Sequence, residues 1–366
     1  MSFTSIPILD LAEAKDSATK PEFLRQLRHA LMEVGFLYLK NVGIPDSLFE
    51  QVIEQGKAFF DIPEEEKLKI EMKNAPSFLG YSRLSAEITA GQIDHREQID
   101  LSTEHPIPGP DAPLYHNLLA PNQWPAESAL PGFRAVYTDY ITRMGAISVA
   151  FTSLIAEAIE LPADAFNKYF DADQQHKLKI VKYPDAADLG LPAGTTAAGG
   201  GQGQQGVGPH KDSMLTSYLL QATAHRGLQV QNVRGAWVDF SIPFFQGVKL
   251  DASFDDLETV GVGEVPDAVR EQREAVAARN GGGRVDDVEF TFRKGGVAKT
   301  LGEATLRNRV KSHPDVGERW YPDILRAIRA EQAAERQQQQ QKGGEKTQQE
   351  SLGRVSSLPV AKVEAH

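Results

Sequence analysis

Cysteine is absent from all 366 residues of this chain. Without thiols the chain has no disulfide framework and no thiolate-ligated metal site. The opening residues Met1-Ser-Phe-Thr-Ser lack the basic and apolar segments of a secretory signal. No apolar run approaches the ~20 residues that a membrane-spanning helix needs. We therefore expect a cytoplasmic protein that is not embedded in a membrane.

Basic residues are also in deficit. Lys and Arg number 39 against 50 Asp and Glu, giving a net charge of −11. No Lys/Arg cluster offsets this balance, so nucleic acid is not an expected partner. Apolar residues make up 41% and charged residues 24% of the chain, as in ordinary globular proteins. The length suffices for one large or two small domains, while nothing in the composition indicates an oligomeric state.

One short motif carries metal chemistry. In Gly206-Val-Gly-Pro-His210-Lys-Asp212-Ser-Met-Leu-Thr-Ser, a histidine precedes an aspartate by two residues. On a strand this spacing places both side chains on one face. Imidazole and carboxylate are two of the three ligands in the facial triad of non-haem Fe(II) oxygenases. The pair alone is a weak signal, because surface hydrogen-bonding pairs share the spacing, and no histidine lies between His225 and His313 to complete the triad.

Several flanking motifs resemble the isopenicillin N synthase-like branch of the 2-oxoglutarate/Fe(II)-dependent dioxygenases. They are Ile6-Pro-Ile-Leu-Asp10-Leu, Leu31-Met-Glu-Val-Gly35-Phe-Leu-Tyr-Leu-Lys-Asn41-Val-Gly43-Ile-Pro, Gly80-Tyr81-Ser-Arg, Asp94-His-Arg-Glu97-Gln-Ile-Asp100, Lys179-Ile-Val-Lys-Tyr183-Pro184, Ser241-Ile-Pro-Phe-Phe245 and Ser312-His-Pro-Asp-Val-Gly-Glu-Arg-Trp320. Together they span most of residues 6–260 and a C-terminal stretch. The resemblance implies an α+β, mainly β fold, with a double-stranded β-helix (jelly-roll) core and flanking helices.

The resemblance also implies a domain layout. An N-terminal dioxygenase-type domain would occupy residues 1–120 and a helical segment 121–175. The jelly-roll domain would occupy 176–260, with a flexible Gly/Ala/Gln-rich insert at 185–206. A C-terminal helical region would follow at 261–330, and a Gln-rich disordered tail at 331–366.

Site residues follow from the same likeness. The cofactors would be Fe(II), 2-oxoglutarate and O2, with ascorbate as a possible addition in vitro, and the partner would be a small-molecule substrate. The implied residues are His210 and Asp212 for the metal, Tyr183 and Ser241 for 2-oxoglutarate, and Tyr81, Arg83 and His95 on the substrate side.

The chain departs from the family near residue 239. If Ser241 is the serine of the family's Arg-x-Ser pair, Asp239 occupies the arginine position and carries the wrong charge for a carboxylate. Trp237-Val-Asp239, however, looks like a strand well upstream of that pair. We therefore infer that a block of about three strands, on the order of forty residues, is missing between Asp239 and Phe240. That block would contain the second histidine and the arginine.

Two explanations fit this gap: an erroneous gene model, or a true pseudoenzyme. The expected function is oxidative C–H functionalisation of a small molecule with decarboxylation of 2-oxoglutarate, impaired or lost in this chain. The alternatives are a non-catalytic small-molecule binding protein and an oxidase independent of 2-oxoglutarate. We interpret His225 as a solvated turn residue, and His313 as a capping or packing residue.

The incomplete triad predicts weak metal binding. We expect this chain to bind Fe(II) or Mn(II) much more weakly than a relative with all three ligands, because a lost ligand removes one bond and much of the geometry. Anaerobic isothermal titration measures this. A micromolar site that disappears in Asp212→Ala would contradict the prediction and reveal a third ligand.

Overall fold

The computed structural model describes residues 5–89, 92–170, 172–184, 212, 214–220, 243–253, 265–279 and 296–334. The insert predicted at 185–206, the junction at 239–240 and the tail beyond residue 334 lie outside these ranges. The domain boundaries proposed from the sequence stay predictions.

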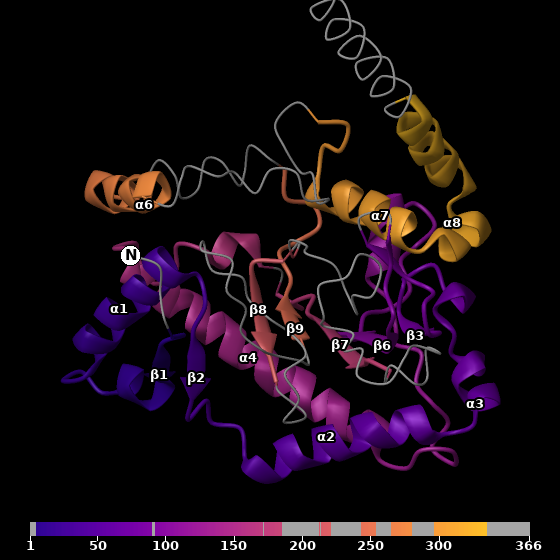
Figure 1. The fold of residues 1–366 in the computed structure, drawn as a ribbon, viewed down its shortest axis with the longest axis horizontal. Coiled ribbons are helices and arrows are strands. Elements are labelled where there is room, and N and C mark those ends of the chain that lie inside the picture. Colours follow the sequence, from indigo (N-terminus) through magenta and orange to yellow (C-terminus); the bar gives the residue numbers. More distant parts are fainter. Residues whose placement is uncertain are drawn as a thin grey trace, which may run out of the picture.

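A five-stranded antiparallel sheet forms the centre of the described structure (Figure 1). Its strand order is β3-β6-β7-β9-β8. The strands are β3 (Gly80–Ser82), β6 (Glu97–Ser102), β7 (Lys177–Lys182), β8 (Thr216–Leu219) and β9 (Pro243–Gln246). Strands from the predicted N-terminal and jelly-roll regions thus share one sheet. Two smaller sheets pair β1 (Ile8–Asp10) with β2 (Tyr38–Lys40) and β4 (Ile88–Thr89) with β5 (Gln92–Ile93).

Helices flank this sheet. The α-helices are α1 (Lys20–His29), α2 (Asp46–Asp61), α3 (Glu64–Lys69), α4 (Phe133–Ala158), α6 (Asp267–Arg279), α7 (Leu301–Ser312) and α8 (Pro314–Trp320), and a further helix covers 322–334. Short turns of other helix types are η1 (Leu11–Lys15), η2 (Ala30–Val34), η3 (Met72–Asn74), η4 (Leu114–Leu118) and η5 (Asn167–Tyr169). Figure 1 shows α2 and α4 along one side of the sheet, with α7 and α8 on the other.

Local sequence accounts for the first helix and strand. Phe23 and Leu27, one helical turn apart, are both fully buried on α1. The helix continues through the π-turn η2 and ends at Gly35, whose φ of +82° is a left-handed conformation that glycine adopts without strain. The apolar spacing of Phe23, Leu27 and Leu31 predicts this helix and Gly35 predicts its end, and the structure confirms both. The sequence also predicts a strand at 36–39, helices at 48–60 and 137–161 and a strand at 178–183, which are present as β2, α2, α4 and β7.

The long helix α4 is the structural core. It is long and apolar enough to span a membrane by length and composition, which corrects the expectation that no such segment exists. However, its residues Phe133, Tyr137 and Tyr140 pack into the same buried cluster as the sheet residues Ile99 and Leu178. An apolar helix covered by the sheet on one side is the ordinary core helix of a globular domain.

The two faces of the sheet differ sharply in chemistry. Alternate residues of β6 and β7 (Ile99, Leu101, Leu178 and Ile180) join the apolar cluster beneath α2 and α4. The residues between them point the other way and are also buried, although they are polar: Gln98, Asp100, Ser102, Lys177 and Lys179. A buried polar face requires partners from whatever covers it.

Ion pairs from the C-terminal helices supply some of those partners. Arg309 of α7 lies 3.4 Å from the Asp100 carboxylate, and His313 Nε2 lies 3.4 Å from Glu87. Lys179 bridges the two acids at 3.5 and 3.4 Å. His313 is also the residue between α7 and α8 and packs against Phe78, which confirms its interpretation as a packing residue at a helix boundary. These pairs fix α7 over the polar face.

Strand β8 is the last strand of the sheet within the described residues. It pairs with β9 from Thr216↔Gln246 to Leu219↔Pro243, and no other described strand lies on its far side.

We predict that Glu87→Gln destabilises the fold by about 3 kcal/mol, because it leaves buried cations short of their counter-charge. Glu66→Gln, which removes only the partner of exposed Lys69, is the matched control and should cost less than about 1 kcal/mol. Urea unfolding measures both.

A pH series adds a second check. The pKa of Glu87 lies well below its ordinary 4.5, so the stability it contributes is complete above pH 4.5 and declines as the pH falls further. Equal losses of unfolding free energy in Glu87→Gln and Glu66→Gln would show that the buried network stabilises the fold no more than an exposed ion pair does.

Candidate functional site

The polar face of the sheet is the best candidate for the functional surface. The register pairs Asp100 with Lys179 and Ser102 with Lys177 across β6 and β7. Asp100 also accepts a hydrogen bond from Gln98 at 2.9 Å. Charged side chains are rarely buried unless they are paired or functional. A row of them on the inner face of a sheet therefore marks a site, not ordinary core.

One end of this face is built around Glu87 and Arg96. Arg96 donates to Glu87 at 2.6 Å and also lies 2.9 Å from Asp94. Burial pushes the pKa of Glu87 upward, but the charges of Lys179, His313 and Arg96 outweigh it and keep the carboxyl ionised. Arg96 Nε is buried and has no hydrogen-bond partner among the described residues. The guanidinium thus retains one unused donor.

Tyr183, the predicted 2-oxoglutarate contact, stands beside Arg96. Glu97 pairs with Lys182, so the next cross-strand position brings Arg96 opposite Tyr183. Burial raises the pKa of Tyr183, and the adjacent Arg96 charge opposes that rise. The phenol therefore stays protonated at neutral pH and can donate to an anion at this end of β7.

Asp212, the predicted metal ligand, lies at the other end of the same face. It accepts a hydrogen bond from Ser217 of β8. Ser217 pairs with Phe245, and Phe245 pairs with Lys177, so these residues form one row across three strands. Within the described ranges no three His, Asp or Glu side chains gather as a metal-binding group. Asp212 thus provides one oriented carboxylate, the type of ligand that Fe(II) accepts.

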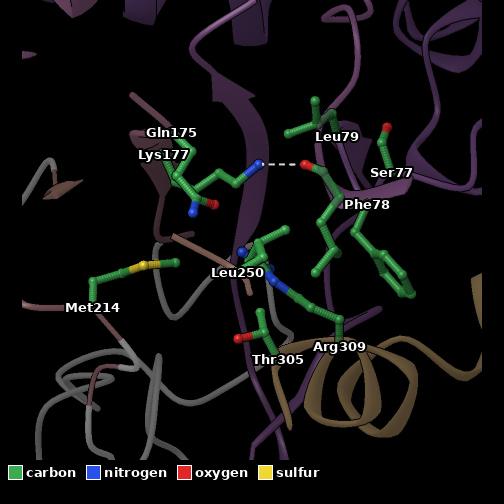
Figure 2. Close-up of a pocket in the computed structure, with 10 residues that line it drawn as sticks. Ser77, Phe78, Leu79, Gln175, Lys177, Met214, Leu250, Thr305 and Arg309 are labelled. Carbon is green, nitrogen blue, oxygen red and sulfur yellow. Dashed lines mark hydrogen bonds between the residues drawn. The ribbon is translucent and has the colours of Figure 1, made fainter. Parts of the chain in front are cut away.

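A small pocket opens beside this row, between the sheet, α7 and the segment around Phe78 (Figure 2). Lys177 and Arg309 enter it from opposite sides, and Met214 lies at its edge two residues beyond Asp212. Lys177 Nζ donates to the Leu118 carbonyl oxygen at 2.8 Å. Burial and the like charge of Arg309 lower the pKa of Lys177 to about 7, against a smaller opposing effect of Asp100. At neutral pH this amine is therefore only partly protonated.

The predicted substrate-side residues do not gather at this face. Tyr81 pairs with Ile99, points to the helix-covered side and donates to Glu97 at 2.8 Å within the apolar core. Arg83 follows directly after β3 and forms an ion pair with the buried Glu71 at 2.6 Å. His95 Nδ1 lies 3.1 Å from Ser85 Oγ in the segment next to Arg96. Of the three, only His95 remains a neighbour of the polar face.

Four residues that mattered in the sequence lie outside the described residues: His210, Ser241, His225 and Asp239. Their roles stay predictions. Conversely, sequence reasoning missed Arg96, Lys177 and Arg309. The alternation in Lys177-Leu-Lys-Ile180 normally indicates a strand with lysines in water, whereas the structure buries them beneath α7. The complementary Asp100 in the paired strand was the available signal.

Comparison with known proteins now identifies the family. Residues 6–127 match the family model described as non-haem dioxygenase in morphine synthesis N-terminal. The chain is 57% identical to the 2-oxoglutarate-dependent dioxygenase frbJ of Dothideomycetidae sp. (strain 11243), with 91% of this chain and 97% of that protein aligned. It is 32% identical to a 2-oxoglutarate-dependent dioxygenase of Gibberella zeae, covering 91% and 95%.

The alignments also measure a length difference. The alignment with frbJ has 376 positions, whereas 91% of 366 residues is about 333. About 43 positions therefore hold a residue in the relative and none in this chain. The Gibberella zeae alignment has 381 positions over the same 91%, which gives about 48 such positions.

A solved structure agrees in fold. A full-length protein of Neurospora crassa, crystallised in complex with alpha-KG, superposes with a TM-score of 0.55 at 19% identity, covering 75% of this chain and 96% of that one. The jelly-roll fold expected from the motifs is thus confirmed. From its identity to full-length relatives, this chain belongs to the 2-oxoglutarate-dependent dioxygenases, which use non-haem Fe(II), 2-oxoglutarate and O2 to oxidise small molecules.

Proposed function

We propose that this chain is a small-molecule oxygenase of that family whose own turnover is impaired by a missing internal block between Asp239 and Phe240. The observation that carries the proposal is the length difference of about 43 positions against frbJ. Its size agrees with the block of about forty residues inferred from the motifs.

The residues present would have separate roles in binding the metal and 2-oxoglutarate. His210 and Asp212 would hold the metal, and Tyr183 and Ser241 would hold the far carboxylate of 2-oxoglutarate. Asp212 is oriented by Ser217, and Tyr183 carries its proton beside Arg96. The described strands place these two residues at opposite ends of the face, about 20 Å apart, which is longer than one 2-oxoglutarate molecule, so the two roles do not fit together in this arrangement. The bound metal and co-substrate would supply oxygen activation, and the protein would supply orientation and exclusion of water.

The expected loss of turnover follows from the acidic side chain of Asp239. In place of the arginine fork that would pair with a carboxylate, an acidic side chain would repel it. The main rival, a non-catalytic small-molecule binding protein, uses the same polar face without turnover. A 2-oxoglutarate-independent oxidase would still need a complete metal site. We further propose a cytoplasmic location and no nucleic-acid or membrane partner, from the acidic composition and the absence of a basic cluster.

We predict no substrate-independent decarboxylation of 2-oxoglutarate by this chain. Succinate release is measured with Fe(II) and ascorbate present, and His210→Ala serves as the control. Insertion of the corresponding block of frbJ between Asp239 and Phe240 should raise succinate release at least tenfold over the chain as given.

Two outcomes contradict the proposal. Release above the His210→Ala control in the unmodified chain would show that the chain is already active. A folded chain with the inserted block that still releases no succinate would favour the non-catalytic binding protein. Genomic DNA across the junction separates an erroneous gene model from a true pseudoenzyme, because only the former contains an in-frame His and Arg before Ser241.

A further inference from the structure

The predicted metal ligand and the predicted 2-oxoglutarate contact lie far apart on the polar face. Lys177, Phe245 and Ser217 form one cross-strand row, and Ser217 donates a hydrogen bond to Asp212. Tyr183 lies six residues beyond Lys177 along β7, which is about 20 Å at the rise of a strand. Two strand spacings add about 10 Å across the sheet. The two ends of the face are therefore at least about 20 Å apart.

One 2-oxoglutarate molecule is too short to join these ends. Four C–C bonds separate its two carboxylate carbons, which therefore lie at most about 5 Å apart. Two metal–oxygen bonds of about 2 Å and a hydrogen bond of about 2.7 Å extend the line of contacts from Asp212 to Tyr183 to at most about 14 Å. The separation of the two residues exceeds this reach, even when every contact is fully extended.

Tyr183 is held at its own end of the face. The guanidinium of Arg96 forms a hydrogen bond with the Tyr183 hydroxyl. Arg96 in turn lies 2.6 Å from Glu87 and 2.9 Å from Asp94, and both acids are buried. The tyrosine therefore cannot swing toward Asp212 without leaving a buried network of charges.

The segment that carries Asp212 is anchored at the other end. The backbone N–H of Leu215 donates to the carbonyl oxygen of Gln246 at 3.2 Å. Gln246 is fully buried, and its side-chain oxygen accepts hydrogen bonds from Thr216 at 2.6 Å and from Thr152 of α4 at 2.9 Å. This anchor fixes the start of β8 against the core helix.

The direction of β8 leaves little room for a shift. β7 and β8 run in the same direction, because both are antiparallel to β9. Leu215 therefore lies about 7 Å on the far side of the row from Tyr183. Three residues span at most about 10 Å, so Asp212 would pass the row by only about 3 Å even without its hydrogen bond to Ser217.

We infer that the metal-bearing segment and the co-substrate end of this chain are two separated sites, which no single 2-oxoglutarate molecule joins. The roles of Asp212 and Tyr183 rest on the proposed function, whereas their separation is a property of the fold. Oxidation at a metal requires the co-substrate within contact distance. The separation is thus a second cause of impaired turnover, in addition to the missing ligands.

The test measures the separation directly. Because the chain has no cysteine, Asp212→Cys carries a nitroxide label at one position of the full chain. Fluorotyrosine replaces tyrosine, and fluorine NMR records the broadening that the label causes. Tyr218 follows Ser217 on β8 and is the near reference, and Tyr183 is the distant residue. Since broadening falls with the sixth power of distance, Tyr218 should broaden at least about fivefold more than Tyr183.

The controls assign the signals and check the fold. Tyr183→Phe and Tyr218→Phe identify the two resonances, and the reduced, diamagnetic label gives the reference line widths. If Asp212→Cys does not fold by circular dichroism, Leu215→Cys carries the label on the same segment, because Leu215 is 42% exposed. The same ratio is expected from that position. Equal broadening of Tyr183 and Tyr218 would place the segment beside Tyr183 and overturn the inference.

The outcome is separable from that of the proposed function. Equal broadening in the chain as given, with succinate release once the frbJ block is inserted, would reject the separated sites and keep the oxygenase. Unequal broadening, in a chain that stays inactive after the block is inserted, would keep the separated sites and reject the oxygenase.

Discussion

Charge burial on one face of the central sheet is the constraint on which the described structure depends. Asp100 and Glu87 would be costly to bury alone, and the surrounding cations hold the pKa of Glu87 well below its ordinary value. Lys179 joins them, and Arg309 and His313 reach them from the C-terminal helices. The same contacts that satisfy the acids thus fix α7 over the sheet. Removing one member would leave the others buried without a counter-charge. The network therefore specifies a single arrangement of sheet and C-terminal helices.

This arrangement also divides the polar face into two ends with different chemistry. At one end Arg96 and Tyr183 present donors suited to an anion, and we propose from the likeness to the family that Tyr183 contacts 2-oxoglutarate. At the other end the row from Lys177 to Ser217 leads to Asp212.

Family membership and activity of this chain are separate matters. Full-length relatives establish the family, and residues 6–127 match a family model of non-haem dioxygenases. The activity depends on a few ligands near one junction. Loss of a few strands from a jelly roll would remove the catalytic groups they carry and leave a sheet edge unpaired. We propose that the missing block is such a loss.

The sequence by itself determined the family, the jelly-roll class and most local elements. Helical spacing and Gly35 predicted α1 and its end, and the apolar strand residues Leu178 and Ile180 predicted β7, because periodicity and turn chemistry are local properties. Tertiary structure alone decided which side of β7 is the site. The local pattern of Lys177 and Lys179 indicates a solvent-facing row, and only α7, over a hundred residues later, covers them. Likewise Tyr81, proposed for the substrate side, points into the apolar core, because it pairs with Ile99 and both side chains lie on the same face of the sheet. Burial and register are products of distant pairing, which no local pattern contains.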